Sequence, residues 1–242
     1  MSSPGASASM GRLLLVCDDS AIIQQLAEAM QQFAVATEVC VDVNMALRLL
    51  NRKKFEAVIV DRGLAQADEV LAQVRLSPSN RTAVTFAIVD PRNPTGFEIP
   101  PNFSMEKPLS MSSVGQTLKA AFGLIVRERR RSFRCPISVP GAVQSNGQET
   151  DCRLVNISEG GLAITDSPAL RAGMQVRVLF TLPGHPVRFK IEAEVCWQDG
   201  KGRAGLRSLT IFSEQKSILQ EWLAAKLEED LPESVAQQFR KD

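Results

Sequence analysis

The sequence has little histidine and no glycine-rich phosphate loop. It contains a single histidine, His185, which lies in a Pro-Gly turn with no candidate Ser or Cys partner. The sequence therefore argues strongly against a Ser-His-Asp or Cys-His catalytic site. No glycine-rich phosphate loop precedes a predicted helix, so nucleotide hydrolysis has no support. No run of about 18 apolar residues exists, and no membrane span is expected.

The cysteines are few and scattered, and the charges nearly cancel. No pair of the five cysteines has metal-ligand spacing, and their odd number argues against a disulfide framework. They are expected to be small apolar fillers in a reducing compartment: Cys17, Cys40, Cys135, Cys152 and Cys196. Because the net charge is only +1, any basic site must be local.

Residues 1–10 are rich in Ser, Gly and Ala and lack the apolar segment of a secretory signal. We expect a disordered tail there and a second, polar tail at 229–242. A cytoplasmic location is expected.

In the first half of the chain, short apolar runs alternate with helical patterns. Residues 12–17 and 57–60 are near-continuous apolar runs, as expected for strands buried on both faces. The predicted strands are 12–17, 37–41, 57–60, 84–89 and 103–106, and the predicted helices are 20–33, 44–52, 67–76 and 111–126. Ser20 is a plausible N-cap for the first helix. This alternation predicts a doubly wound α/β domain with a five-stranded parallel sheet over residues 11–126.

In the second half, the period of the apolar residues changes from helical spacing to two. Residues 174–182 and 187–197 alternate apolar and polar side chains, which is typical of strands with one buried face. Further strands are predicted at 137–143, 152–157, 162–165 and 204–211, and a closing helix at 213–227. A small antiparallel β-barrel over residues 127–228 follows from this count. Trp197 continues the inward alternation and is expected in the core.

Two short clusters in the second half carry most of the chemistry. The first is the run Arg127-Glu128-Arg129-Arg130-Arg131-Ser132-Phe133-Arg134 at the domain junction. A guanidinium grips phosphate through two parallel hydrogen bonds and stacks on a base. The second is Asn156-Ile157-Ser158-Glu159-Gly160-Gly161, a polar turn between two apolar strands. Taken singly, the first also fits a solvated basic linker and the second an ordinary β-turn.

Together, at this spacing, the clusters resemble the PilZ domain. That family carries an R-x-x-x-R motif before its barrel and a D/N-x-S-x-x-G motif on an adjoining strand. The resemblance covers about residues 128–227 and includes Trp197 and the following Gly202-Arg203-Ala204-Gly205-Leu206-Arg207. PilZ domains bind the bacterial second messenger cyclic di-GMP. The resemblance therefore implies a cyclic di-GMP receptor.

The resemblance also implies a role for each motif residue. Arg130 and Arg134 would hold the phosphates and stack on guanine, with Arg129 and Arg131 assisting. Asn156 and Ser158 would hydrogen-bond the guanine or the ribose-phosphate. Gly161 would shape the turn, at a position that needs positive φ or the close approach of a ligand. All motif positions are present, so binding is expected.

Acidic residues follow the predicted parallel strands. Asp18 and Asp19 come after the first strand, Asp61 ends the third, and Lys107 follows the fifth. Carboxyl ends of parallel strands meet at one edge of the sheet, where three carboxylates could hold Mg²⁺. Residues 11–126 thus resemble a response-regulator receiver domain. The resemblance implies that Asp61 is the phosphoacceptor and that Lys107 pairs with the phosphoryl group.

The receiver resemblance is incomplete. Ile88 stands near the position of the family's hydroxyl residue, and Arg62-Gly63-Leu64-Ala65 lacks the usual Met-Pro stretch. A phosphorylated receiver and a silent receiver-fold scaffold therefore both stay open.

The sequence favours a non-enzymatic signalling protein that binds cyclic di-GMP, rearranges its arginine segment and reports to an unidentified downstream protein. A homodimer is compatible with this role. The alternative is a phosphorylation-dependent receiver with the barrel as an interaction module. A nucleic-acid binder is disfavoured, because total charge is near zero and no aromatics interleave with the arginines.

Overall fold

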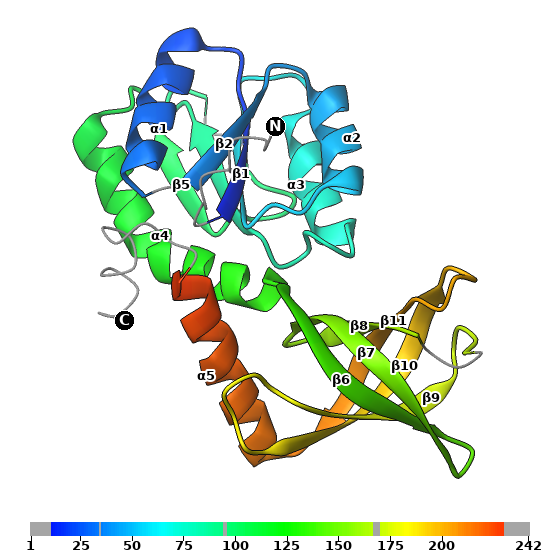
Figure 1. Ribbon diagram of the computed structural model, residues 1–242. Coiled ribbons are helices and arrows are strands. Elements are labelled where there is room, and N and C mark those ends of the chain that lie inside the picture. The colour runs from blue at the N-terminus through cyan, green and yellow to red at the C-terminus, as the bar shows by residue number, and fades with distance from the viewer. Residues whose placement is uncertain (1–10, 34, 94–95, 167–169, 230–242) are drawn as a thin grey trace, which may run out of the picture. The chain divides into compact units, whose positions relative to one another are not determined.

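The structure, a computed structural model, describes residues 11–33, 35–93, 96–166 and 170–229 and divides the chain into two compact units (Figure 1). Within the described residues, the N-terminal unit ends at Arg129 and the C-terminal unit spans Arg130–Glu229. The tail expected at 1–10 lies outside the described residues. So does the tail expected at 229–242, apart from Glu229, which ends the last helix.

The N-terminal unit is a five-stranded parallel sheet in the order β2-β1-β3-β4-β5. Its strands are β1 (Gly11–Val16), β2 (Val35–Cys40), β3 (Ala57–Asp61), β4 (Val84–Val89) and β5 (Phe103–Glu106). Its helices are α1 (Ser20–Gln32), α2 (Val43–Arg52), α3 (Ala67–Leu76) and α4 (Met111–Ser132). Helices α1 and α4 cover one face and α2 and α3 the other (Figure 1). This confirms the predicted doubly wound α/β class and matches the strand order of flavodoxin and CheY.

Burial explains why the apolar runs of this unit became central strands. The side chains of Leu13, Leu14 and Leu15 in β1 are fully buried, as are Val58, Ile59 and Val60 in β3. One packing layer joins these strands to α2 and α3 through Leu50 and Val70. On the other face, Phe33 at the end of α1 lies against Phe122 of α4, with ring centroids 5.6 Å apart.

Helix α4 runs further than the sequence predicted. The predicted end was residue 126, whereas the helix continues to Ser132 and takes in Arg129, Arg130 and Arg131. Arginine has a high helix propensity, and no Pro or Gly interrupts the chain between Leu124 and Ser132. The first arginine of the R-x-x-x-R motif is therefore helical.

The C-terminal unit is a closed antiparallel barrel in the order β10-β11-β8-β7-β6-β9, as predicted. Its strands are β6 (Cys135–Ser145), β7 (Gln148–Ser158), β8 (Gly161–Thr165), β9 (Gln175–Thr181), β10 (Arg188–Gln198) and β11 (Ala204–Ile211). Helix α5 (Ser213–Glu229) follows and buries Leu219, Leu223 and Leu227, which lie on one stripe at four-residue spacing. The indole Nε1 of Trp222 on α5 donates a hydrogen bond to the carbonyl of Pro183, at 3.1 Å.

Two residues near the end of β10 are more exposed than the sequence predicted. Trp197 was expected in the core but is 47% exposed, and Cys196, expected to be a small apolar filler, is exposed on the polar face of the strand. The exposure of Trp197 follows from a register shift in the pairing of β10 with β11, between Val195 and Trp197. Such a bulge opposes two residues to one and turns the following side chain to the other face. The other four cysteines are buried and unpaired with one another, as expected.

Within the described residues, no helix is long and apolar enough to cross a membrane.

Candidate functional site

The arginine segment enters the C-terminal unit between two buried side chains. Phe133, which is 6% exposed, follows the last turn of α4, and Cys135 starts β6 with 6% exposure. Arg134 lies between them and is exposed, while Arg130 in the last turn of α4 is partly buried. The chain is therefore fixed by apolar packing on both sides of Arg134, and its guanidinium group faces solvent.

Strand pairing brings the two motifs together. In the β6–β7 pair, Cys135 lies opposite Ile157 and Pro136 lies opposite Asn156. Arg134 immediately precedes this pairing, next to the first residue of the strand that runs beside Asn156. Within the C-terminal unit, the end of the arginine segment and the polar turn are therefore neighbours.

Asn156 carries an unsatisfied polar atom. Its Oδ1 is buried and has no hydrogen-bond partner among the described residues. A buried amide oxygen without a donor is destabilising, and such atoms in native proteins often mark the place of a ligand. Asn156 lies opposite Ala163 of β8, so its side chain projects from the outer face of the barrel wall, away from the core residues Ile157 and Leu162.

The acidic edge of the N-terminal unit is arranged differently from the expected cation site. Asp61 is 1% exposed, and its Oδ2 accepts from the Lys107 ammonium at 2.7 Å and from the Cys17 thiol at 3.4 Å. Its Oδ1 accepts from the Gly63 amide at 2.8 Å. Burial alone would lower the pKa of Lys107, but the hydrogen bond and the charge of Asp61 outweigh it and raise that pKa. Asp61 is thus the buried half of an ion pair.

The other two carboxylates do not join Asp61. Asp19 is the N-cap of α1, in place of the predicted Ser20, and its Oδ1 accepts from the amides of Ala21 and Ile22. Asp18 is exposed. Over the part of the chain that the structure describes, no group of three His, Cys, Asp or Glu side chains could hold a metal ion. As placed, Asp18, Asp19 and Asp61 do not fit a bound Mg²⁺.

Comparison with protein families matches the PilZ domain to residues 128–225. Residues 128–225 are a PilZ domain. The match begins at Glu128, inside α4, and ends inside α5. The barrel, most of its closing helix and both predicted motifs lie within it.

Solved structures with similar folds fall into two groups. The Bacillus subtilis inhibitor of motility MotI/DgrA is 22% identical over 38% of this chain, with a TM-score of 0.34, and this chain covers 48% of its length. The PilZ domain of CeSA from a cellulose-synthesizing bacterium is 23% identical over 40% of this chain and 99% of its own, with a TM-score of 0.33. The Pseudomonas aeruginosa PA1611 receiver domain is 16% identical over 47% of this chain and 98% of its own, with a TM-score of 0.41. A comparison with curated proteins gave no match.

Within the PilZ domain, Ser158 and Gly161 build the turn between β7 and β8. The hydroxyl of Ser158 is buried and donates to the carbonyl of Gly161 at 2.9 Å. A Cβ on Gly161 would collide with the carbonyl oxygen of Leu206 on β11. The glycine is therefore required by a close approach of two strands rather than by positive φ. The hydroxyl of Ser158 is therefore engaged in a hydrogen bond within the turn.

A residue that sequence reasoning set aside lies on the same outer face of the PilZ domain. Trp197 pairs with Gly205, Gly205 with Ala163, and Ala163 with Asn156, so the four form one cross-strand row. The indole of Trp197 lies where a Cβ of Gly205 would be, so only glycine leaves room for it. Opposing a tryptophan to a glycine across a hairpin is a signal that could have revealed this surface. The row ends with an exposed aromatic ring on one side and Asn156 on the other.

Proposed function

We propose that the PilZ domain binds cyclic di-GMP on the outer face of its barrel, between Arg134 and the β7–β8 turn. PilZ domains bind this ligand, and the family match covers both motifs. The observation that carries the proposal is the buried, unpartnered Oδ1 of Asn156, one strand away from the exposed Arg134. The ligand offers N–H donors on its guanine edges for Oδ1 of Asn156, and phosphate anions for the guanidinium of Arg134.

The chemistry of each group fits a cyclic dinucleotide. Arg130 and Arg134 can each hold a phosphate through paired N–H donors, or lie flat on a purine. Arg129 and Arg131 lie in the same turn of α4 and add positive charge. Oδ1 of Asn156 accepts from an N–H on the edge of guanine. Gly161 and Ser158 keep the turn narrow, so that the ligand reaches Asn156 without a side chain in its path.

The protein acts, on this proposal, as an effector that reports the nucleotide to a downstream protein. A ligand shifts a conformational equilibrium only when its contacts differ between the two states. Arg130 and Arg134 supply such contacts, since they belong to the segment that links the units and would gain contacts with phosphate. The role is binding and signalling rather than catalysis.

Calorimetry with cyclic di-GMP tests the proposal. We expect saturable binding by the wild type and binding weakened at least about tenfold in Arg134→Ala, the loss of about one charge-assisted hydrogen-bonded pair. Arg153→Ala is the matched control, because Arg153 is an exposed arginine of β7 that pairs opposite Pro140, away from the motif. Equal affinities for wild type and Arg134→Ala would remove Arg134 from the site.

The phosphorylation alternative is separated by a second experiment. Both oxygens of Asp61 are already engaged by Lys107, Cys17 and Gly63, so the carboxylate is poorly placed to attack a phosphodonor. We expect no adduct by intact mass after incubation with acetyl phosphate and Mg²⁺. An adduct lost in Asp61→Asn, in a protein that binds no cyclic di-GMP, would establish the alternative.

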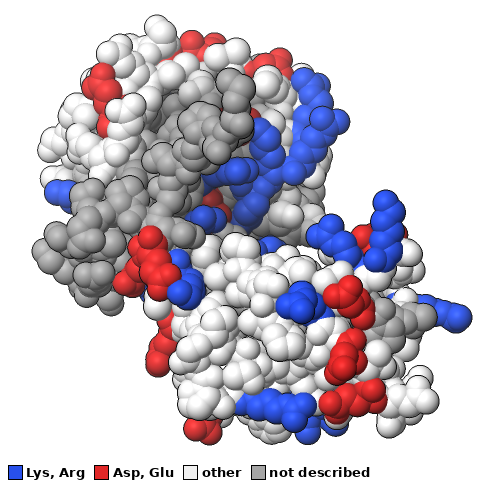
Figure 2. Space-filling model, viewed as in Figure 1, with Lys and Arg blue, Asp and Glu red and all other residues white. Residues whose placement is uncertain are grey.

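Nucleic-acid binding gains no support from the surface. On the face shown in Figure 2, basic and acidic side chains of the barrel unit are interspersed. Arg207, for example, pairs with Glu194 at 2.7 Å, and Arg177 with Glu192 at 2.6 Å. Steeply salt-dependent binding to random DNA would contradict this view.

A further inference from the structure

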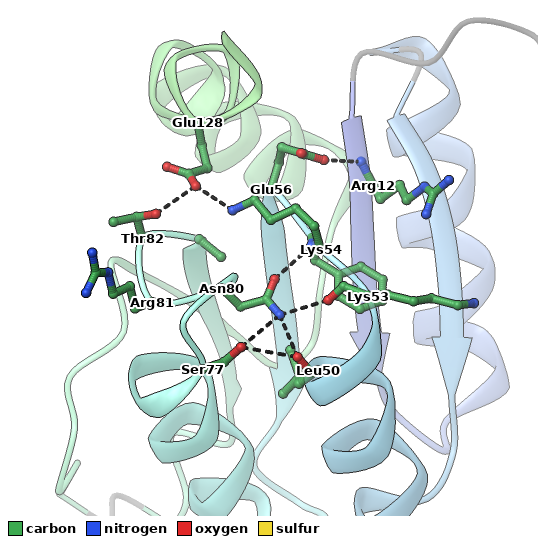
Figure 3. A network of polar contacts seen from close by, with 12 residues as sticks. Arg12, Leu50, Lys53, Lys54, Glu56, Ser77, Asn80, Arg81, Thr82 and Glu128 are labelled. Carbon is green, nitrogen blue, oxygen red and sulfur yellow. Dashed lines mark hydrogen bonds and ion pairs between the residues drawn. The ribbon is translucent and has the colours of Figure 1, made fainter. Parts of the chain in front are cut away.

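Glu128 is the one acidic residue in the arginine run, and it is buried. Its side chain is 6% exposed, and it points from α4 toward two loops of the N-terminal unit (Figure 3). It accepts from the ammonium of Lys54 and from the hydroxyl of Thr82, the latter at 2.7 Å. Lys54 precedes β3 and Thr82 precedes β4, so these contacts lie at the amino edge of the sheet, opposite Asp61.

The two loops that receive Glu128 are themselves held rigidly. Asn80, fully buried, donates to the carbonyls of Leu50 and Lys53 at 2.8 and 2.9 Å (Figure 3). Its Oδ1 accepts from the amide of Phe55 at 2.8 Å. A buried network whose members are all satisfied defines a single conformation. Lys54 and Thr82 are therefore presented to Glu128 in fixed positions.

The position of Glu128 in the sequence gives these contacts a consequence for the ligand site. Glu128 belongs to the N-terminal unit, and Arg130, the first motif arginine, begins the C-terminal unit two residues later in the same helix. A carboxylate buried at this point fixes the last turn of α4, and hence the backbone of Arg129 and Arg130.

We propose that Glu128, Lys54 and Thr82 form a latch that orders the arginine segment and links the ligand site to the N-terminal unit. Glu128 is a positioning residue: it touches no ligand, and it acts by reducing the freedom that Arg130 loses on binding. Ordering a segment before the ligand arrives raises affinity. By reciprocity, bound ligand stabilises the latch and the loops that carry Lys54 and Thr82. This affinity effect rests on the proposed function.

Two conservative variants each remove the ion pair between Glu128 and Lys54, one by changing each partner. Glu128→Gln keeps the shape of the side chain and its contact with Thr82 but loses the charge. Lys54→Gln removes the same ion pair from the other element. The matched control is Lys53→Gln, because Lys53 makes an ion pair with Glu38 at 2.8 Å from the same loop, on the solvent side and away from α4.

Hydrogen exchange without nucleotide tests the ordering. We expect the amides of residues 129–132 to exchange several-fold faster in Glu128→Gln and in Lys54→Gln than in the wild type, and at the wild-type rate in Lys53→Gln. Unchanged exchange in both latch variants, with the fold intact by circular dichroism, would overturn the proposal.

Cyclic di-GMP titrations then test the linkage. Both latch variants should bind about fivefold to tenfold more weakly than wild type, and the double variant no more weakly than either. Nucleotide should slow exchange in the loops around Lys54 and Thr82 in the wild type and lose that effect in Glu128→Gln. Wild-type affinity in the latch variants, or protection confined to the barrel, would contradict the linkage. If the wild type binds no nucleotide, the proposed function fails, while the nucleotide-free exchange still decides whether the latch orders the segment.

Discussion

At the scale of single residues, the motif positions divide into those that build the β7–β8 turn and those that we propose contact the ligand. Gly161 and Ser158 are buried and engaged within the β7–β8 turn, whereas Arg134 is exposed and Asn156 has an open acceptor. The sequence predicted all four as site residues. It assigned the turn to Gly161 but grouped Ser158 with the ligand contacts, because the hydrogen bond from Ser158 to the Gly161 carbonyl depends on how the turn folds.

Replacing Gly161 by alanine should destabilise the PilZ domain. The added Cβ would meet the carbonyl oxygen of Leu206, which is backbone and cannot turn aside. We expect a loss of about 2 kcal/mol in unfolding free energy, measured by urea denaturation. Gly160→Ala is the control, since a Cβ there has no atom within 4 Å, and it should change stability by less than about 0.5 kcal/mol. Equal stabilities for the two variants would show that β8 and β11 separate without cost.

Cys17, which is buried, and Cys196, which is exposed, should react differently with iodoacetamide. Burial above all, with a further contribution from the charge of Asp61, raises the pKa of the Cys17 thiol to about 12, although the hydrogen bond to the Asp19 carbonyl acts in the opposite direction. The thiolate is the reactive form, so Cys17 stays protonated at pH 8 and should be inert in the folded protein. Exposed Cys196 should be labelled first, as peptide mass spectrometry would show. Early labelling of Cys17 would mean that the buried region around Cys17 and Asp61 opens readily to solvent.

At the scale of elements, the decisive departure from prediction is the length of α4. The sequence placed a domain boundary near Val126, where the apolar residues change from helical spacing to a period of two. Arginine favours the helix, however, and Glu128 provides a buried contact that a sequence pattern cannot distinguish from a surface charge. The bulge in β10 is a second such case, since one inserted residue reverses the facing of Trp197.

The loops that support α4 should depend on Asn80. Asn80→Ala removes two hydrogen bonds to carbonyls and leaves the buried amide of Phe55 without an acceptor. We expect a loss of about 3 kcal/mol in unfolding free energy. Asn51→Ala, which removes an exposed hydrogen bond to Gln73, should cost less than about 1 kcal/mol. If the two variants denatured at the same urea concentration, the loops would not be held as described.

At the scale of the whole molecule, the architecture was largely predictable. Near-continuous apolar strands alternating with helices specified the parallel sheet, and period-two strands specified the barrel. The contacts of the acidic residues in the N-terminal unit were the least predictable part. Asp18, Asp19 and Asp61 follow the right strands, but Asp19 caps α1 and Asp61 pairs with Lys107. The spacing of residues in the sequence does not show which nearby group each carboxylate will bind.

The most direct test of the account is a calorimetric titration of cyclic di-GMP into the wild type and into Asn156→Ala. Since Oδ1 of Asn156 has no partner in the described structure, its removal should not lower the urea midpoint. We predict saturable binding by the wild type and an affinity lower by about tenfold in the variant, the loss of one hydrogen bond to a buried acceptor. A wild type without saturable heat, or a variant that binds as tightly as wild type, would contradict the account.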